Sequence, residues 1–470
     1  MSGPPQGWPG RGADRQKRGL RETRDTLTET FATDLAAEVE TLFGAAAHAV
    51  DLEALETAVR RRALGFAARL VEGLLNADHG DHAGPRQSCD ACGGVAAYAG
   101  RRPKIVTTML GPMRLERAYY HCPTCKAGCH PRDRTLGIER SALSSGVVRM
   151  IGLAAARTSF AETGALLHDL AGLNVCAKQA HRTARALGHA IAVDEHDIDT
   201  AEPGRAPTMY LGMDGTGVPV RKADTAGRPG KQADGTAKTR EVKLVVGWAG
   251  ATDEHGHDLP AREPGSVSYS AAVESAATRD TDAQPSPFAQ RVEREARRRG
   301  FHHARRQAVL GDGAPWIWNI ADELFPNAIQ IVDLFHAKEH LWDVAKDIYG
   351  PGTDMAERWA KRRQDELDDG RLDALLRALR RHASHDAARR CIDYLRRNRH
   401  RMRYPQFRAM RLCVTSGVVE AGCKHVVGTR FKRPGMHWSV DGVNAMAALR
   451  CSVLSNRFND FWKRQQHRVA

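Results

Sequence analysis

The sequence predicts an α/β sheet domain that an all-helical segment interrupts, preceded by helical regions and a cysteine-rich module. Three observations support this fold class. Two successive units of strand, acid and helix occur around 308–312 and 328–333. Residues 351–410 show no strand pattern and are rich in arginine. Two Cys-x-x-Cys pairs flank a strand-like span in the first third of the chain.

Length and composition limit the possible classes of protein. A chain of 470 residues with 42% hydrophobic residues can hold two to four domains with apolar cores. No apolar run approaches the roughly 18 residues of a membrane span, and the N-terminus lacks the apolar segment of a signal peptide. We therefore expect a cytoplasmic protein without a membrane partner. The net charge of +14 favours a polyanionic partner such as nucleic acid, although an arginine-rich genome gives the same balance.

The first 80 residues fall into two parts. Residues 1–24 are rich in Gly, Pro and Arg, which predicts a disordered N-terminus. Residues 25–80 carry apolar side chains at steps of three and four, for example Leu35, Val39 and Leu42. This pattern predicts an amphipathic helical region whose role is core packing or self-association.

Residues 85–135 have the cysteine spacing of a zinc ribbon-like module. Cys89 and Cys92 precede a predicted β-hairpin, and Cys122 and Cys125 follow it. Each pair can direct two thiolates at one tetrahedral Zn²⁺, and a site closed by four thiolates is structural. A set of reduced structural cysteines is the alternative, and Cys129 and His130 remain open as further ligands.

Residues 136–200 are predicted to be helical and to resemble a helix-turn-helix. A helix at about 160–170 is followed by a glycine-containing turn and a second helix at about 175–190. A plain helical hairpin gives the same pattern. The candidate DNA contacts on the second helix are Lys178, Gln179, Arg182 and Arg185.

The first part of the sheet domain spans 208–345 and opens with two predicted strands, 210–213 and 243–248. A long polar loop joins them, and Asp214 stands where the first strand is expected to end. The loop lacks the spacing of a phosphate-binding Walker loop, which argues against nucleotide hydrolysis. Its candidate DNA contacts are Lys231, Lys238 and Arg240. Glu241, close to the second strand, remains open as an accessory acid.

Two further acids follow buried strands. Ala308–Leu310 forms a predicted strand, Asp312 stands at its C-terminal end, and Pro315 opens a helix. Residues 328–332 repeat the pattern, with Asp333 next and a helix from about 336. The sequence therefore predicts a sheet with its acids at one edge.

Residues 346–410 are predicted to be a helical insertion, and 411–470 to complete the sheet domain. Glu420 lies early in a helix that starts near Ser416, and a closing helix is expected at about 439–458. Basic residues that could contact DNA phosphates follow Glu420. They are Lys424, Arg430, Lys432 and Arg433.

Three of these acids suggest a metal-dependent reaction. Asp214, Asp312 and Glu420 offer the hard oxygen ligands that Mg²⁺ or Mn²⁺ prefers. Three converging carboxylates can hold two such ions, one activating a hydroxyl and the other stabilising the leaving oxygen of a phosphoryl transfer. Each acid alone is also compatible with a helix cap or a turn.

Several longer segments resemble a known family. The segments DGTGVPV, GKQADGTAKTREVKL, VLGDGAPWIWN, IVDLFHAKEHLW, SGVVEAGCKHVVGTRFKRPGMHWS and NAMAALR resemble bacterial insertion-sequence DDE transposases of the ISKra type, which are related to Mutator-like transposases. The resemblance covers about residues 85–460. It implies an RNase H-like catalytic core with a helical insertion before the Glu, and Asp214, Asp312 and Glu420 as the metal-binding triad. Asp333 and His336 match the accessory Asp-x-x-His of the Mutator-like group, although His336 could instead cap its helix.

The resemblance also implies a function. Such a protein binds the terminal inverted repeats of its insertion sequence, cleaves double-stranded DNA and joins 3′-hydroxyl ends to target DNA. It would act as a homodimer or larger synaptic complex, associated with the bacterial nucleoid. The alternatives are a DNA-binding regulator with an inactive RNase H-like domain and a plain metal-dependent nuclease.

Overall fold

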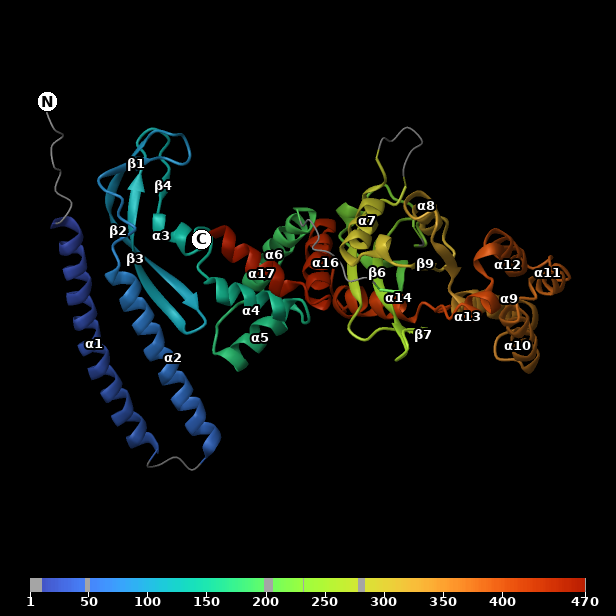
Figure 1. The fold of residues 1–470 in the computed structure, drawn as a ribbon, viewed down its shortest axis with the longest axis horizontal. Helices are drawn as coiled ribbons and strands as arrows, with labels where there is room; N and C mark the ends of the chain where they lie inside the picture. Colours follow the sequence, from blue (N-terminus) through green and yellow to red (C-terminus); the bar gives the residue numbers. More distant parts are fainter. Residues whose placement is uncertain (1–10, 47–50, 198–205, 231, 278–283, 470) are drawn as a thin grey trace. The chain divides into compact units, whose positions relative to one another are not determined.

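The computed structural model describes residues 11–46, 51–197, 206–230, 232–277 and 284–469 (Figure 1). The chain divides into two compact units. The first comprises Met1–Ala154, Phe160–Ala180 and Trp462–Ala470, and the second comprises Ala155–Ser159 and His181–Phe461. The division falls within a helix, so the region predicted as 136–200 is shared between the units.

The first unit begins with two long helices, α1 (Arg11–Ala46) and α2 (Leu52–Ala77). The carboxylate of Asp51 caps α2 by accepting a hydrogen bond from the N–H of Glu53 at 3.2 Å. Residues 11–24 are helical, contrary to the predicted disorder of 1–24, while residues 1–10 lie outside the described chain. The prolines of this stretch all precede residue 10, and residues 13–24 consist mainly of good helix formers.

An antiparallel sheet of order β1-β2-β3-β4 follows. Its strands are β1 (Arg86–Ser88), β2 (Val95–Thr108), β3 (Gly111–His121) and β4 (Gly128–Cys129), with the short helix α3 (Pro131–Thr135) after them. Helix α2 packs on β3, where Asn76 bonds both the carbonyl of Arg114 and the N–H of Glu116 at 2.8 Å. The predicted hairpin between the cysteine pairs is therefore confirmed.

Three helices share the next core: α4 (Ser145–Ala155), α5 (Phe160–Ala171) and α6 (Ala177–Asp197). Val147 and Ile151 of α4 pack with Leu167 of α5 and Ala180 of α6. The turn between α5 and α6 begins at Gly172, whose φ of +67° suits a residue without a side chain. The two helices and the turn expected from the sequence are confirmed.

The second unit contains a mixed six-stranded sheet. Its path runs β10-β9-β5-β6-β7, and β8 also pairs with β6. Strands β5, β9 and β10 are parallel to one another, whereas β6 is antiparallel to β5, β7 and β8. The bounds are β5 (Thr208–Pro219), β6 (Thr239–Thr252), β7 (Asp258–Arg262), β8 (Ser268–Ala272), β9 (Arg306–Gly311) and β10 (Ile329–Val332).

Helices cover this sheet and extend beyond it (Figure 1). They are α7 (Pro287–Arg299), α8 (Pro315–Leu324), α9 (Leu334–Tyr349), α10 (Asp354–Asp368), α11 (Leu372–Arg380), α12 (Asp386–Arg397), α13 (Tyr404–Ala409), α14 (Gly417–Gly422), α15 (Thr429–Phe431) and α16 (Val440–Leu454). The last helix, α17 (Phe458–Val469), begins in this unit and belongs to the first unit from Trp462. Short 3₁₀ turns occur at Lys222–Asp224, Phe301–His303 and Arg399–Arg401, and a π-helix spans Cys423–Gly428. The closing helix expected at 439–458 is two helices, because Asn456 adopts a φ of +58° between them.

A buried ion cluster connects α7 to Arg457, which lies between α16 and α17. The carboxylate of Glu295 is fully buried and accepts hydrogen bonds from Ser268, Arg298 and Arg457. Burial alone would raise the pKa of Glu295, but Arg457 and Arg298 hold it below its ordinary value. The cluster therefore stabilises the fold at neutral pH, and this contribution is lost as the pH falls through the lowered pKa.

Replacing Glu295 by Gln is expected to lower the free energy of unfolding by about 3 kcal/mol at pH 7, the lower end of the cost of breaking a buried ion pair. Arg298 and Arg457 lose their fully buried counter-charge and keep Glu195, at 3.8 and 3.4 Å. Urea denaturation at pH 7 measures the loss. The difference from wild type should shrink as the pH falls through the pKa of Glu295. Glu293→Gln on the same helix is the matched control, since its partner Arg297 is exposed and a surface pair contributes about 1 kcal/mol or less.

Candidate active site on the sheet

Asp214 lies within strand β5 and not at its end. The strand continues to Pro219, and Asp214 pairs with Leu244 of β6 in the antiparallel ladder. The expected strand end at Met213 was wrong because the glycines at 215 and 217 continue the pairing, opposite Lys243 and Glu241. Asp214 therefore projects from a fixed ladder position.

The register of the parallel strands places Asp312 beside Asp214. Gly212 of β5 pairs with Leu310 of β9, and Asp312 follows Gly311, the last residue of β9. The two acids lie close enough for the charge of Asp312 to raise the pKa of Asp214, in addition to the larger effect of burial. Strand β9 separates β5 from β10. Asp312, and not Asp333, therefore follows the strand that pairs with β5.

The loop after β9 is held in place by its own hydrogen bonds. The carboxylate of Asp312 accepts a bond from the N–H of Ala314 at 2.8 Å, and the hydroxyl of Tyr394 donates to the Asp312 carbonyl at 2.9 Å. Gly313 has a φ of +99°, and a Cβ there would collide with the Tyr394 ring. Helix α12, which carries Tyr394, thus fixes the acid-bearing loop.

Helix α14 brings Glu420 to the same face of the sheet. A Cβ at Gly212 would overlap Val419 of α14, so the helix packs directly on β5. The thiol of Cys423 donates to Oδ2 of Asp214 at 3.1 Å. Glu420 is exposed and precedes Cys423 by three residues, which is a neighbouring position on a helix surface. Helix α14 begins directly after Ser416, as the sequence predicted, although the Ser416 side chain makes no capping hydrogen bond.

The electrostatics of this face favour a bound cation. Burial raises the pKa of Asp214, and the neighbouring Asp312 carboxylate adds to the rise, while hydrogen bonds from Cys423 and Gly215 oppose it. Two adjacent carboxylates in a partly buried site are the donor set that a divalent cation requires. Their oxygen ligands are of the type that Mg²⁺ or Mn²⁺ prefers. Asp214, Asp312 and Glu420 do not, however, bring ligand atoms within 4.8 Å of one another as a group of three.

Glu241 belongs to the opposite face. A Cβ at Gly215 would meet the Glu241 carboxylate, and Gly215 alternates with Asp214 along β5. Glu241 forms an ion pair with Lys243 at 2.6 Å. It is not a partner of Asp214.

Asp333 connects β10, α9 and α14. One carboxylate oxygen caps α9 by accepting from the N–H of His336 at 2.7 Å, and the other accepts from the N–H of Ser416. Asp333 is buried, so both oxygens are committed to backbone donors. The side chain of His336 contacts Glu339 at 3.2 Å, and its charge lowers the pKa of Asp214. Asp333 thus positions the helix that bears Glu420.

Asp333→Ala is expected to destabilise the protein by about 2–4 kcal/mol, the sum of a lost helix cap of about 1 kcal/mol and an unsatisfied N–H of about 1–3 kcal/mol. Thermal and urea unfolding measure the loss, and amide hydrogen exchange at Ser416 should accelerate. Asp322→Ala is the control, because that exposed acid bonds the Gln330 side chain, lies 3.9 Å from Arg401 and should change stability by about 1 kcal/mol or less. Equal losses in both variants would contradict this role for Asp333.

The four cysteines predicted to bind zinc lie together. Cys89 and Cys125 have their sulfurs 3.6 Å apart, and Cys92 and Cys122 have theirs 3.7 Å apart. All four sulfurs lie within 4.8 Å of one another, and no other group of three or more His, Cys, Asp or Glu side chains does so in the described parts of the chain. Tetrahedral Zn–S bonds of about 2.3 Å require sulfurs about 3.8 Å apart.

The cluster could therefore bind zinc, and its surroundings support that chemistry. The backbone N–H of Cys125 lowers the pKa of the Cys122 thiol, which favours the thiolate that a metal needs. A hydrogen bond from the backbone of Gly94 alone would lower the pKa of Cys92, but the neighbouring cysteines outweigh it and raise that pKa. Cys129 and His130 are not part of the cluster. Cys129 accepts a bond from Gln87 at 2.9 Å, and His130 bonds the carbonyl of Ala118 at 3.1 Å.

The candidate DNA contacts differ in exposure. Lys178, Arg182, Arg185, Lys238, Lys424 and Lys432 are exposed, and Gln179, Arg240 and Arg433 are half-buried. Arg185 bonds Asp441 at 2.7 Å, and Arg240 donates to the carbonyl of Asp224. Lys231 lies outside the described residues.

The burial of Arg430 does not agree with its predicted role as a contact to DNA phosphates. Its side chain is fully buried, donates to the carbonyl of Ala155 at 3.2 Å and stacks on Trp438. The π-helix at 423–428 shifts the helical phase, so α15 turns Arg430 inward. Lys432 instead reaches the site, where its ammonium donates to the hydroxyl of Thr216 on β5 at 2.6 Å.

Sequence reasoning missed two side chains of the site. Cys423 contacts Asp214, and Tyr394 fixes the Asp312 loop. Cys423 could have been found from the sequence, since it lies one helical turn after Glu420 in the same motif and so belongs to the same side of the helix. Nothing in the sequence of α12 distinguishes Tyr394 from a core residue.

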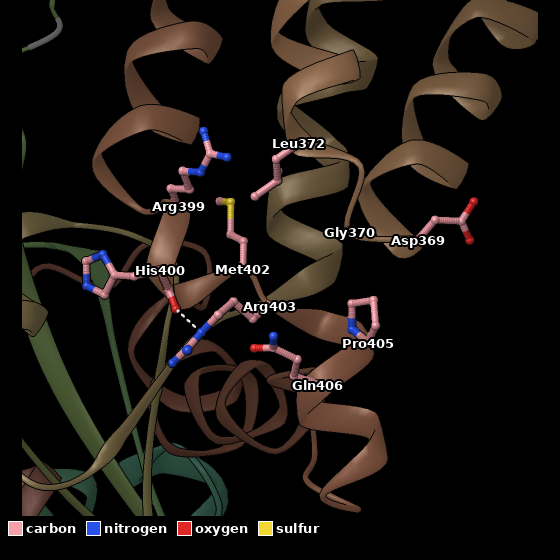
Figure 2. A pocket seen from close by; sticks show the side chains of 9 residues that line it. All are labelled: Asp369, Gly370, Leu372, Arg399, His400, Met402, Arg403, Pro405 and Gln406. Atoms are coloured by element: carbon pink, nitrogen blue, oxygen red, sulfur yellow. Dashed lines mark hydrogen bonds between the residues drawn. The ribbon is translucent and has the colours of Figure 1, made fainter.

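A separate pocket of about 580 Å³ lies among the helices that follow α9 (Figure 2). Leu372 and Met402 are buried in its wall, and Arg399, His400 and Arg403 stand around it. Arg399 is already paired with both oxygens of Asp373, at 2.8 and 2.7 Å. None of the predicted acids lines this pocket, which is therefore not the site of their chemistry.

Within the described residues, no helix combines the length and apolar character needed to cross a membrane. No protein-family model matches the sequence, and no curated protein matches it. Structural matches include the Drosophila P element transposase strand transfer complex, with 11% identity and a TM-score of 0.25 over 72% of this chain and 83% of that chain. At that TM-score the similarity carries no argument about function.

Proposed function

We propose that this protein is a transposase of an insertion sequence, which cleaves DNA at the terminal inverted repeats and joins the 3′-hydroxyl ends to target DNA. The observation that supports the proposal is the proximity of Asp214 and Asp312, at the face of the sheet where Cys423, at the end of α14, contacts Asp214. Glu420 on that helix supplies the third carboxylate. The motif resemblance supplies the reaction class.

The sheet supports an RNase H-like assignment for the catalytic core. Three antiparallel strands, β5, β6 and β8, are followed in the chain by β9 and β10, which add parallel to β5. The resemblance implies this fold with a helical insertion before the Glu. Helices α10 to α13 stand in that place, between β10 and α14.

The chain's own residues have distinct roles in the proposed reaction. Asp214, Asp312 and Glu420 would hold Mg²⁺, which supplies activation of the attacking hydroxyl and stabilisation of the leaving oxygen. Because Glu420 is exposed and the three acids are not yet grouped, DNA and metal binding would draw α14 toward the sheet edge. Cys423 and the N–H of Gly215 orient the Asp214 carboxylate. Lys432 would neutralise a phosphate beside the acids.

The remaining modules would bind the DNA. The four-cysteine module and the α5–α6 helices would recognise the element ends, with Lys178 and Arg182 exposed at the start of α6. These contacts are electrostatic in large part, so binding should weaken steeply with salt. Two ends must be processed together, which requires two copies or a larger synaptic complex.

A cleavage and joining assay tests the proposal. The substrate is linear DNA carrying the sequences that flank the gene, with supercoiled plasmid as target and Mg²⁺ present. We expect nicks at the element ends and covalent products in the plasmid. Cleavage without joining would establish the plain nuclease, and binding without cleavage would establish the regulator; either result would overturn the transposase assignment.

A further inference from the structure

The helical hairpin formed by α1 and α2 leaves its apolar side chains largely uncovered. Among the side chains that the structure describes in these two helices, Ala68 alone is buried. Leu35 is 50% exposed and Leu74 is 52% exposed. An amphipathic helix pair of this length normally covers its apolar face against another element. Within the described residues, the exposed apolar face of the hairpin therefore lacks the second element that would normally pack against it.

A groove of about 420 Å³ runs between the two helices on this face. Its apolar lining comes from side chains at steps of four on each helix: Leu27, Phe31 and Leu35 of α1, with Phe66, Leu70 and Leu74 of α2. The helices approach closely beneath it, since a Cβ at Gly73 would lie 3.2 Å from the Phe31 ring. Rows spaced by four residues form the ridges that accept another helix.

The charge pattern of α1 indicates which helix fits the groove. Residues 11–24 contain six Lys or Arg against two Asp or Glu, whereas residues 25–46 contain five Asp or Glu and no Lys or Arg. In an antiparallel contact between two copies of α1, the basic half of each copy therefore lies against the acidic half of the other. In a parallel contact, halves of like charge would lie against each other. The centre of α1 falls at Thr28–Glu29, among the residues that line the groove. A two-fold axis through this point brings the groove of one copy onto the groove of the other.

We propose that the hairpin pairs with the hairpin of a second copy of this chain, as an antiparallel four-helix bundle. The apolar rows of the two hairpins interdigitate across the two-fold axis, and the α1 charges fix the direction. This contact needs neither DNA nor metal. A role of this contact in holding the two DNA ends of an insertion sequence together rests on the proposed function. The contact itself does not depend on that function.

Sedimentation velocity of the full chain, without DNA or Mg²⁺, tests the contact. Wild type should be a dimer at micromolar concentration, and Leu35→Glu and Leu74→Glu should each raise the dimer dissociation constant by about a hundredfold, as loss of a central apolar contact does. Both leucines are already half-exposed, so the fold should survive; circular dichroism checks this. Leu170→Glu, at a leucine of α5 that is 67% exposed, is the matched control and should remain dimeric.

Charge reversal tests the direction. About this axis Glu40 of one copy lies opposite Lys17 of the other. Glu40→Lys should weaken the dimer, as should Lys17→Glu with Arg18→Glu, and the three substitutions together should restore it. A monomeric wild type, or dimers that persist in both leucine variants, would overturn the proposal. If the dimer of the triple variant is as weak as those of Glu40→Lys and of Lys17→Glu with Arg18→Glu, the antiparallel arrangement is wrong. Because these readouts contain no DNA, they separate this inference from a failure of the transposase proposal.

Discussion

Asp214→Asn is expected to reduce Mg²⁺-dependent DNA cleavage by about a thousandfold or more, while the protein stays folded. The substitution keeps the shape of the side chain and its bond from the N–H of Gly215, but removes the charge that would hold the metal. Loss of several kcal/mol of charge stabilisation in the transition state corresponds to roughly this factor. Single-turnover cleavage of end DNA measures it. Asp312→Asn and Glu420→Gln should fall into the same range.

Glu241→Gln provides the matched control for this series. Glu241 is an acid on the same strand pair, but it belongs to the opposite face and pairs with Lys243. It should retain cleavage within a few-fold of wild type. If Glu241→Gln is as inactive as Asp214→Asn, or if all three triad variants cleave normally, the assignment of the site is wrong.

Cys125→Ser is expected to abolish stoichiometric zinc binding and to unfold the four-cysteine module. The exposed Cys125 contributes little to the apolar core, so its replacement acts through the metal. Binding to four thiolates contributes on the order of 10–16 kcal/mol to the folding of small zinc modules. The measurements are metal content by mass spectrometry and hydrogen exchange of the β2–β3 hairpin, which should lose its protection. Chelation of the wild-type protein should have the same effect.

Cys176→Ser is the control for zinc, because Cys176 is exposed and lies outside the cluster. It should retain one zinc ion per chain. Zinc content that is unchanged in Cys125→Ser, or absent from the wild-type protein, would show that the cluster is a set of reduced thiols.

The sequence was most informative where local pattern decides the structure. The strand, acid and helix order around Asp312 and Asp333 is confirmed by β9, α8, β10 and α9. The grouping of the four cysteines could also be predicted from their spacing, because each Cys-x-x-Cys turn and the hairpin between them fix where the sulfurs lie. In these segments, spacing along the chain determines spacing in the fold.

Other features depended on contacts between distant segments. The extension of β5 beyond Met213 follows from pairing with β6, which overrides the glycines. The inward turn of Arg430 follows from a π-helix that a period of 3.6 residues does not predict. The contact of Cys423 with Asp214 joins residues 209 positions apart and depends on how α14 packs on Gly212. Sequence periodicity carries no information about such pairs.

Iron-directed cleavage of the polypeptide tests the central claim most directly. Fe²⁺ replaces Mg²⁺ at carboxylate sites and, with ascorbate and peroxide, cuts the backbone beside the bound ion. The full chain bound to end DNA should be cut near residues 214, 312 and 420, and all three cuts should disappear in Asp214→Asn but persist in Glu241→Gln. Cuts confined to one of these segments, or unchanged in Asp214→Asn, would contradict a metal site shared by the three acids.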